Sequence, residues 1–379
     1  MNNKQNKVSA IVFMAILLVL PIMTLISKKD SFSATENRSL ATFPKFNIES
    51  IKDKSFMNGF EEYISDHFIG RTKWVEAKVG TEVIIGKEEI NGVYITNDML
   101  IQKLGEPDYE KVDKAMEAIN NFADDNNKAN VYVMFTPSAG GIYSEEFPTN
   151  APVVNQKAFI DYMYKKLDNK VTTIDVYNSL NAVRDEYIYY RNDHHWTSYG
   201  AFCAYKTAIQ RLGFSEVSYN KYHIEHASND FKGTLYSKTL YDKIAPDTID
   251  LYNYENGAKV TSVEVNDGME VKEYESIYFR EYLEEKDKYL VYLGQNQPLI
   301  TIKTDVKNDK KLLIIKDSYA NSFIPFLTQH YSEITVLDLR FIRTSYNNIV
   351  NMDDYNQVLI LYGAGTLEND ETLKILNYN

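Results

Sequence analysis

Residues 311–319, Lys-Leu-Leu-Ile-Ile-Lys-Asp-Ser-Tyr, decide the fold class of the chain. The apolar run in this stretch is short and unbroken, which is typical of a strand buried on both faces of a parallel sheet. The following residues, 319–330, have the pattern of a helix, so Ser318 stands at the turn from a strand into a helix. Open α/β sheets bind their ligands at the edge where the strands end. The stretch therefore predicts an α/β fold with Ser318 at its functional edge.

Ser318 has two interpretations. A serine at the start of a helix can attack a carbonyl carbon while its own N–H group holds the resulting oxyanion. The same position is also the ordinary place of a capping serine that carries no chemistry. A nucleophilic serine needs a base and an orienting acceptor, so the interpretation depends on what lies elsewhere in the chain.

Strand and helix patterns alternate on both sides of this stretch. Short runs that suit strands occur at 130–135, 171–176, 187–190, 334–339 and 357–362. Helical spacing of apolar residues occurs at 50–68, 71–84, 109–123, 155–167 and 197–212, and a hairpin is expected at 92–101. This alternation predicts a mostly parallel sheet with helices on both faces. Residues 214–300 break the rhythm and are rich in Tyr, Asp and Glu, so we expect a β-rich insertion at about 214–300.

The amino terminus has the pattern of a membrane segment. Residues 8–26, VSAIVFMAILLVLPIMTLI, contain no charged residue and nearly span a hydrocarbon core of about 30 Å as a helix. Two lysines flank the segment on each side, so the distribution of positive charge does not fix its orientation. A cleaved signal peptide is the alternative, although residues 31–33 make a poor cleavage site. We expect an uncleaved, single-pass anchor in the cell membrane with the globular part outside the cytoplasm.

Three regions follow from these patterns. Residues 1–30 form a tail and transmembrane anchor, 31–47 form a polar linker, and 48–379 form the catalytic domain with its insertion. The single cysteine, Cys203, excludes an intramolecular disulfide and a cysteine-based zinc site. A net charge of −12 without basic runs argues against a nucleic-acid partner and mildly favours a neutral substrate.

The base is expected in Asp193-His194-His195-Trp196, which lies between a strand and a helix. Asp193 and His195 are two residues apart, so a tight turn lets the carboxylate reach Nδ1 of the imidazole. The competing interpretations are a packed histidine beside a tryptophan and an aspartate that only caps a turn. The four residues followed by Thr197 are less expected by chance than either residue alone.

Together these residues resemble the DHHW family of bacterial envelope proteins, which is similar to the alginate O-acetylation proteins of the SGNH (GDSL-like) hydrolase superfamily. The resemblance runs from about residue 36 to the C-terminus. It rests on Asp193-His-His-Trp196, Lys316-Asp-Ser-Tyr-Ala-Asn-Ser322, Glu36-Asn-Arg-Ser-Leu40, Tyr63-Ile-Ser-Asp-His-Phe68, Phe231-Lys-Gly-Thr-Leu235 and Val336-Leu-Asp-Leu-Arg340. It implies an SGNH-like sheet and a triad of Asp193, His195 and Ser318, in a permuted chain order that a triad tolerates.

The glycine of the usual Gly-Asp-Ser signature is absent, because this chain has Lys316-Asp317-Ser318. The signature therefore does not identify the groups that would donate hydrogen bonds to an oxyanion. Gly294 and Asn296 are candidates, although a turn explains Gly-x-Asn equally well. Arg340 follows a strand and is a candidate for substrate or oxyanion contact, against an ordinary structural arginine. Tyr319, beside the serine, is a further candidate for such a contact.

The resemblance implies an O-acetyltransferase that needs no cofactor and no metal. An acetyl group would pass through acyl-Ser318 to hydroxyls of a cell-surface or secreted polysaccharide. Acetyl-CoA is cytosolic and one transmembrane helix cannot carry an acyl group across a bilayer. A membrane-bound O-acyltransferase is therefore expected as the partner that supplies the acetyl group.

Three rival functions stay open. A carbohydrate acetylesterase would use the same triad, with water in place of the sugar. A metal site would need Asp193, His194 and His195 to join His223 and His226, the two histidines of an H-x-x-H. A non-catalytic module would bind glycan or hold together an exopolysaccharide synthesis complex.

Overall fold

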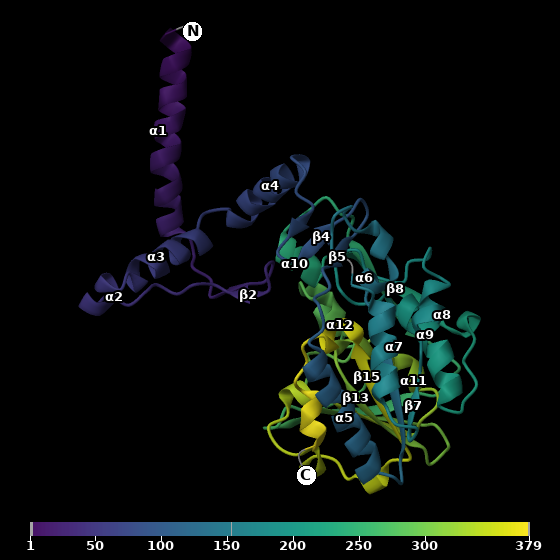
Figure 1. Cartoon of the computed structure of the whole chain (residues 1–379). Helices are drawn as coiled ribbons and strands as arrows, with labels where there is room; N and C mark the ends of the chain where they lie inside the picture. Colours follow the sequence, from purple (N-terminus) through teal and green to yellow (C-terminus); the bar gives the residue numbers. More distant parts are fainter. Residues whose placement is uncertain (1–2, 153, 378–379) are drawn as a thin grey trace. The chain divides into compact units, whose positions relative to one another are not determined.

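The computed structural model describes residues 3–152 and 154–377, so the outermost residues of the expected ranges, 1–2 and 378–379, lie outside the described residues, as does residue 153. The chain forms two compact units (Figure 1). Unit 1 comprises Met1–Lys87 with Tyr236–Lys243, and unit 2 comprises Glu88–Leu235 with Ile244–Asn379. The expected linker, 31–47, and the helices expected at 50–68 and 71–84 fall in unit 1.

Unit 1 is mostly helical. Its elements are α1 (Asn3–Ile26), β1 (Phe32–Ser33), β2 (Arg38–Ser39), α2 (Ile48–Lys52), α3 (Ser55–Asp66), α4 (Arg71–Ile84) and most of α10 (Thr234–Thr239). Within the described residues, one helix is long and apolar enough to cross a membrane, over Gln5–Ile26 with a mean hydropathy of 2.7. One helix was expected over 50–68, but Lys54 adopts a positive φ of 65° and divides it into α2 and α3.

Asp66 organises the polar part of unit 1. Its carboxylate accepts from Arg38 Nη1 at 3.0 Å, from Arg38 Nη2 at 2.6 Å and from the Ala41 N–H at 2.8 Å. Glu36 accepts from Arg38 Nε at 2.8 Å and also pairs with Arg71. Two of the stretches that carried the family resemblance, 36–40 and 63–68, are thus joined by one ion-pair network.

Unit 2 is built on an eight-stranded mixed sheet in the order β11-β10-β12-β14-β13-β15-β6-β7. The strands in that order are β11 (Val271–Tyr274), β10 (Val260–Asn266), β12 (Leu299–Thr304), β14 (Glu333–Leu337), β13 (Lys311–Lys316), β15 (Gln357–Gly363), β6 (Asn130–Thr136) and β7 (Val171–Thr173). The run from β14 to β7 is parallel, and β12, β10 and β11 extend it in antiparallel pairing. The expected α/β class with a mostly parallel sheet is confirmed.

Alternate residues of the central strands enter two separate cores. Ile314 of β13 packs on one face, where α9 (Ser198–Arg211) contributes Ala201, Tyr205 and Ala208. Ile315 packs on the other face, where α5 (Tyr109–Asp125) and α7 (Gln156–Lys166) bring Val112, Met116, Phe159 and Met163. A strand covered on both faces must be apolar at every position, which explains the unbroken run in β13.

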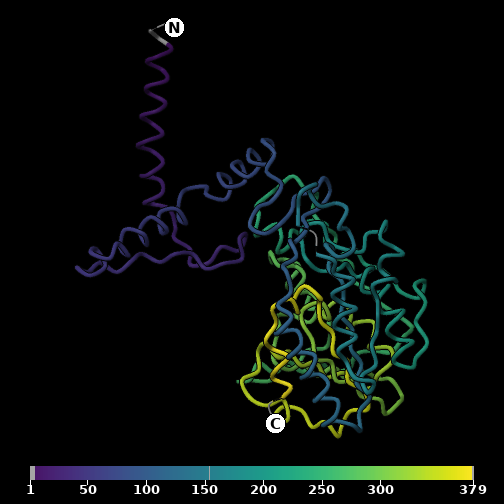
Figure 2. The backbone as a smooth tube through the Cα atoms, in the orientation of Figure 1, coloured from purple at the N-terminus to yellow at the C-terminus, as the bar shows by residue number. Residues whose placement is uncertain are grey.

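The remaining elements of unit 2 are short. They are β3 (Glu89–Ile90), β4 (Val93–Ile95), β5 (Leu100–Gln102), α6 (Ala139–Ile142), α8 (Tyr177–Asn181), α11 (Ile324–Leu327) and α12 (Ala364–Leu367), with several single turns of 3-10 helix. The backbone trace shows the C-terminal segment beside α5 (Figure 2), where the Asn121 amide donates to the Asn377 amide oxygen at 3.0 Å.

The inserted region has two structural roles. Strands β8 (His223–Phe231) and β9 (Asp247–Asn253) pair with each other as a separate two-stranded sheet. Strands β10 and β11 instead join the main sheet through β12. Of these four strands in the segment 214–300, two form a separate sheet and two widen the main sheet.

The segment after Ser318 differs from the expected continuous helix over 319–330. It consists of a 3-10 turn at Ser318–Ala320, an irregular stretch and the short helix α11. Pro325 explains the interruption, because proline lacks the N–H group that a continuing helix needs and is tolerated only in a first turn. Ser318 thus lies in a tight turn directly after β13.

Candidate active site

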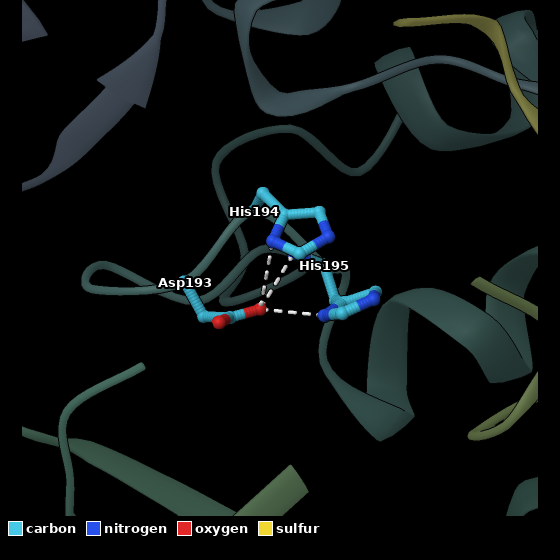
Figure 3. A group of neighbouring side chains, drawn as sticks. All are labelled: Asp193, His194 and His195. Carbon is cyan, nitrogen blue, oxygen red and sulfur yellow. Dashed lines mark hydrogen bonds and ion pairs between the residues drawn. The ribbon is translucent and has the colours of Figure 1, made fainter. Parts of the chain in front are cut away.

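Asp193, His195 and Ser318 form a continuous row of side chains. Nδ1 of His195 lies 2.6 Å from Oδ1 of Asp193, and Nε2 of His195 lies 2.8 Å from Oγ of Ser318. A carboxylate can only accept, so Nδ1 carries the proton and Nε2 can accept the proton of the serine hydroxyl. Figure 3 shows the aspartate facing this imidazole. The three residues expected from the sequence are thus close together in the arrangement that activates a serine.

Four donors surround the Asp193 carboxylate, which is 1% exposed. Oδ1 accepts from the backbone N–H and Nδ1 of His195, and Oδ2 accepts from the backbone N–H and hydroxyl of Thr234 at 2.7 and 2.9 Å. Burial alone would raise the pKa of Asp193, but the charges of His194 and His195 and these hydrogen bonds lower it far below its ordinary value. The carboxylate is therefore ionised and can stabilise a protonated His195.

Gly233 allows Thr234 to approach the carboxylate. A Cβ atom at position 233 would lie 2.2 Å from Oδ2 and 2.5 Å from Cβ of Asp193, so a side chain there would displace Asp193. This contact accounts for the Phe-Lys-Gly-Thr-Leu stretch at 231–235. The sequence suggested that this stretch belongs to the family pattern, but not that it reaches the site.

Asp247, the first residue of β9, holds the loop that carries the histidines. Its buried carboxylate accepts from the backbone N–H groups of Arg191 and Asn192, both at 2.8 Å, and from the Tyr187 hydroxyl at 2.6 Å. Burial raises the pKa of Asp247, and these hydrogen bonds oppose that rise. Nothing in the sequence linked Asp247 to the loop, because it lies in the insertion and far along the chain.

Asp317 shapes the turn that presents Ser318. Its Oδ1 accepts from the Tyr319 N–H at 3.0 Å, and its Oδ2 accepts from the Gly363 N–H at 2.9 Å and the Thr366 hydroxyl at 2.8 Å. These contacts join the carboxyl ends of β13 and β15. The N–H of Ser318 itself has no hydrogen-bond partner within residues 3–152 and 154–377, so it is available to a ligand.

Trp196 and Tyr319 connect the two loops that carry the row. The indole Nε1–H donates to the Tyr319 carbonyl at 3.0 Å, and the Tyr319 hydroxyl donates to the His194 carbonyl at 2.6 Å. The Tyr319 ring also meets the His195 ring edge-on, with 5.3 Å between the ring centroids. The Tyr319 ring therefore helps to position His195. The Tyr319 hydroxyl donates to a backbone carbonyl and is not directed at a ligand.

Lys316, at the position of the missing signature glycine, is buried behind the turn. Its ammonium donates to Asn296 Oδ1 at 2.7 Å and Asn321 Oδ1 at 2.8 Å, and it lies 3.4 Å from Oδ2 of Asp338. Burial lowers the pKa of Lys316 to about 8, although the charge of Asp338 raises it. Because its oxygen is held by Lys316, the Asn296 amide keeps one fixed orientation and its Nδ2 group makes no hydrogen bond within the part of the chain that is described.

Gly294 and Arg340 are engaged elsewhere. The Gly294 N–H donates to the Leu290 carbonyl at 2.9 Å, and its φ of +72° marks a turn that favours glycine. Arg340 donates from Nε at 2.8 Å and Nη2 at 2.6 Å to the two oxygens of Asp338. Of the candidates for an oxyanion contact, Asn296 and the Ser318 N–H therefore have a donor that is available to a ligand. Gly294 belongs to a turn, and Arg340 belongs to an ion pair with Asp338.

The ligand atoms of Asp193, His194 and His195 lie close enough together to suggest a metal site. Both nitrogens of His195 are already engaged by Asp193 and Ser318, and Nδ1 of His194 lies 2.7 Å from the Thr234 hydroxyl. The histidines of the H-x-x-H do not join this group among the described residues. His226 is 74% exposed and pairs with Asp250 on β8 and β9. The five-residue metal site considered from the sequence is not assembled.

Tyr289 is the main feature of the site that the sequence did not indicate. It lies in a 3-10 turn at Lys288–Val291, inside the insertion, and its ring is stacked on the His195 imidazole. Its hydroxyl contacts the turn of Ser318. The chain has thirty tyrosines, and no spacing or motif separates this one from the rest.

Fold and site together define an α/β protein with a serine, histidine and aspartate constellation at the carboxyl edge of its sheet. A family model described as DHHW protein matches residues 109–337, which is more than half of the chain. The chain belongs to the DHHW family, and the resemblance seen in the sequence is confirmed. Comparison with curated protein sequences gives no significant match.

Solved structures of similar fold include two bacterial proteins. A DHHW family protein from Eubacterium siraeum is 25% identical, with a TM-score of 0.65 over 76% of this chain and 96% of that chain. Bacillus cereus PatB1 is 23% identical, with a TM-score of 0.64 over 76% of this chain and 99% of that chain. A second structure of Bacillus cereus PatB1, with a sulfonyl adduct, is also similar to this chain. It is 23% identical and has a TM-score of 0.63 over 75% of this chain and 97% of that chain. The chain therefore shares the fold of both proteins over nearly their whole lengths.

Proposed function

We propose that the protein is a serine-dependent O-acetyltransferase that moves an acetyl group through acyl-Ser318 onto hydroxyls of a cell-surface or secreted polysaccharide. The observation that carries the proposal is the row from buried, ionised Asp193 through His195 to Ser318. A charged carboxylate on Nδ1 favours the imidazolium that forms when Nε2 takes the serine proton. A capping serine would need neither partner.

The reaction has two balanced halves. His195 takes the hydroxyl proton of Ser318, Oγ bonds to the acetyl carbon, and the donor oxygen leaves with that proton. A sugar hydroxyl then gives its proton to Nε2 and attacks the acetyl carbon, and Ser318 Oγ leaves and regains a proton. Asp193 holds the imidazole in one tautomer and orientation throughout.

The tetrahedral intermediate of each half needs donors for its oxyanion. We assign this role to the Ser318 N–H and to Nδ2 of Asn296. Both groups lack a hydrogen-bond partner within the described residues. Lys316 fixes the amide of Asn296, and donors that are fixed before the reaction stabilise an oxyanion most effectively.

The acceptor is inferred from family membership and charge. The similarity of DHHW proteins to alginate O-acetylation proteins implies a polysaccharide. The net charge of −12 favours a neutral polymer over a polyanion. Because one relative carries a sulfonyl adduct, a sulfonyl fluoride is a suitable probe of an activated hydroxyl in this chain as well.

The apolar helix α1 supports the proposal that the reaction takes place at a membrane. The chain is proposed to be a single-pass protein of the cell membrane whose unit 2 lies outside the cytoplasm. An acetyl group from the cytosol must then cross the bilayer by another route. A membrane-bound O-acyltransferase is the proposed partner that delivers it.

The test uses the full-length protein in detergent with a chromogenic acetyl ester as donor and neutral glucan oligosaccharides as acceptors. Products are weighed by mass spectrometry. Wild type is compared with Ser318→Ala and with the control Ser179→Ala, whose hydroxyl contacts Thr207 on α9. We expect acetylated oligosaccharide from wild type and from the control, and none from Ser318→Ala.

Other outcomes separate the rivals. Serine-dependent release of acetate with no acetylated sugar, across several acceptors, would replace the transferase by an esterase. Equal inactivity of wild type and Ser318→Ala toward ester and sulfonyl fluoride would reject the catalytic account in favour of a glycan-binding module.

A further inference from the structure

Tyr289 contacts both the base of the proposed reaction and the backbone of the residue that carries the nucleophile. Its ring stacks on the His195 imidazole with 3.9 Å between centroids and 6° between planes. Its hydroxyl donates to the Ser318 carbonyl at 3.0 Å and lies 3.2 Å from Oγ of Ser322. Tyr319 also meets the His195 ring, from within the Ser318 turn itself, whereas Tyr289 joins that ring to the turn from a separate segment of the chain.

The position of the Tyr289 ring is fixed by an apolar cluster. The ring meets Tyr190 and Tyr292 edge-on, with centroids 6.3 and 5.3 Å away. The same cluster contains Phe231, Ile249, Leu251 and Val291. Tyr289 is 3% exposed, so neither the ring nor the hydroxyl can move away without disturbing that cluster. The stack is therefore part of the folded structure before any substrate binds.

We propose that Tyr289 is a positioning residue that stabilises the imidazolium form of His195 through its ring face and holds the Ser318 turn through its hydroxyl. The face of an aromatic ring attracts a cation, and a ring already in place needs no rearrangement when the charge appears. A positive charge develops on His195 only after it takes the serine proton, so the stack favours the transition state over the resting state. This inference rests on the proposed function.

Several charged or titratable groups face His195 besides Tyr289. Asp193 lies on its Nδ1 side, the His194 ring is 3.8 Å away between centroids, and Tyr319 meets it edge-on. Asp287, two residues before Tyr289, also interacts electrostatically with His195, and burial raises the pKa of this carboxyl to about 6. Variants at position 289 leave all four groups in the sequence, so a change in pH dependence reports the lost stack.

The experiment measures ester hydrolysis by the full-length protein in detergent as a function of pH. Tyr289→Leu removes stack and hydroxyl, whereas Tyr289→Phe removes only the hydroxyl. We expect Tyr289→Leu to lower kcat more than KM changes, by about 3- to 30-fold from the lost cation–π contact alone. The acid limb of the kcat/KM profile should move to lower pH, because the protonated base has lost its stabilisation. Tyr289→Phe should lower kcat less and leave the limb in place.

Two further variants separate electrostatics from packing. The backbone N–H of Tyr190 donates to the His195 carbonyl at 3.2 Å, and Tyr190→Leu keeps this bond while it removes a ring that does not stack on the imidazole. The variant should therefore lower stability and leave the acid limb unchanged. Pentafluorophenylalanine at position 289 keeps the size of the ring but reverses its quadrupole, so it should move the limb as Tyr289→Leu does, even if the leucine variant fails to fold.

The outcomes are distinguishable. An unmoved limb in the fluorinated variant, or equal limb shifts for Tyr289→Phe and Tyr289→Leu, would overturn the inference while the proposed function stands. If wild type hydrolyses no acetyl ester and takes no sulfonyl label, the proposed function fails and Tyr289 loses its role with it.

Discussion

At the scale of single residues, position 193 has the strictest requirement for one particular side chain, a carboxylate. Its two oxygens accept four hydrogen bonds, and an amide at this position would turn a donor toward His195 or Thr234. We expect Asp193→Asn to lower kcat by about 10³- to 10⁴-fold with little change in KM, because the wrong tautomer of His195 is favoured.

The matched control is Asp250→Asn. Asp250 also pairs with a histidine at 2.6 Å, but that histidine is exposed on β8. Ester hydrolysis should be nearly unchanged in this variant. A loss of less than threefold in Asp193→Asn would mean that the carboxylate does not orient the base.

Gly233 is a second residue whose identity the site requires. A methyl group there meets the Asp193 carboxylate, so Gly233→Ala should shift Asp193 and weaken its bonds to Thr234. We expect the free energy of unfolding to fall by about 1–3 kcal/mol. We also expect the rate of ester hydrolysis to fall, because Asp193 no longer orients His195. Gly80→Ala is the control, since position 80 lies in α4 with open space around it and alanine favours a helix. Unchanged activity in Gly233→Ala would refute the close approach.

At the scale of elements, Lys316 at the end of β13 links three loops through Asn296, Asn321 and Asp338. The folded pKa of Lys316 is lowered to about 8, below its ordinary value. The folded protein therefore binds the lysine proton more weakly than the unfolded chain does. As a result, the free energy of unfolding is higher at alkaline pH, where Lys316 is neutral, and it decreases as the pH falls through 8. Between pH 7 and 9, wild type should gain about 1 kcal/mol relative to Lys316→Met.

This prediction is measured by urea unfolding of both proteins at the two pH values. The fluorescence of buried Trp196 reports on unit 2. A stability difference between the two proteins that stays constant with pH, or that falls, would contradict the buried ammonium.

Elements also show how much the sequence could predict. The buried strand before Ser318 and the two-residue spacing of Asp193 and His195 are local patterns that mark these residues as candidates, and the resemblance to the DHHW family joined them into one triad. Tyr289 and Asp247 were not predictable, since they reach the site from an irregular insertion through tertiary contacts alone. The helix expected over 319–330 was wrong, because Pro325 can stand only in the first turn of a helix and the continuous helix is interrupted there.

The sheet shows the same division between local and tertiary information. Strands β13, β15 and β6 are visible in the sequence as unbroken apolar runs, and β14 as an apolar run with one threonine, Thr335, because all four strands are buried on both faces. Strands β10 and β11 carry many polar residues, and they belong to the main sheet only because β10 pairs with β12 and β11 pairs with β10. The antiparallel extension could therefore not be derived from composition.

At the scale of the whole molecule, the end of α1 is part of folded unit 1. Thr24 is 2% exposed and accepts from the Ile69 N–H at 3.2 Å, and Nε2 of His67 lies 3.1 Å from the Asp30 carbonyl. Cleavage after the apolar segment would remove the first of these contacts. We expect the protein to keep its amino terminus and to stay with the membrane pellet after alkaline carbonate extraction.

The measurement is the intact mass of the extracted protein. Thr24→Ala serves as a comparison, because it loses the hydroxyl contact without changing the length of the apolar helix. A mature protein that begins after about residue 30 would show that the segment is a signal peptide.

The central claim is that Ser318 carries the acetyl group. The most direct test is to mix full-length protein with a chromogenic acetyl ester, stop the reaction early with acid, and weigh the protein and its peptides. The account predicts the added mass of one acetyl group on the peptide that contains Ser318, and no such mass in Ser318→Ala or after prior sulfonylation. Acetylation at another residue, or acetyl release that continues unchanged in Ser318→Ala, would contradict it.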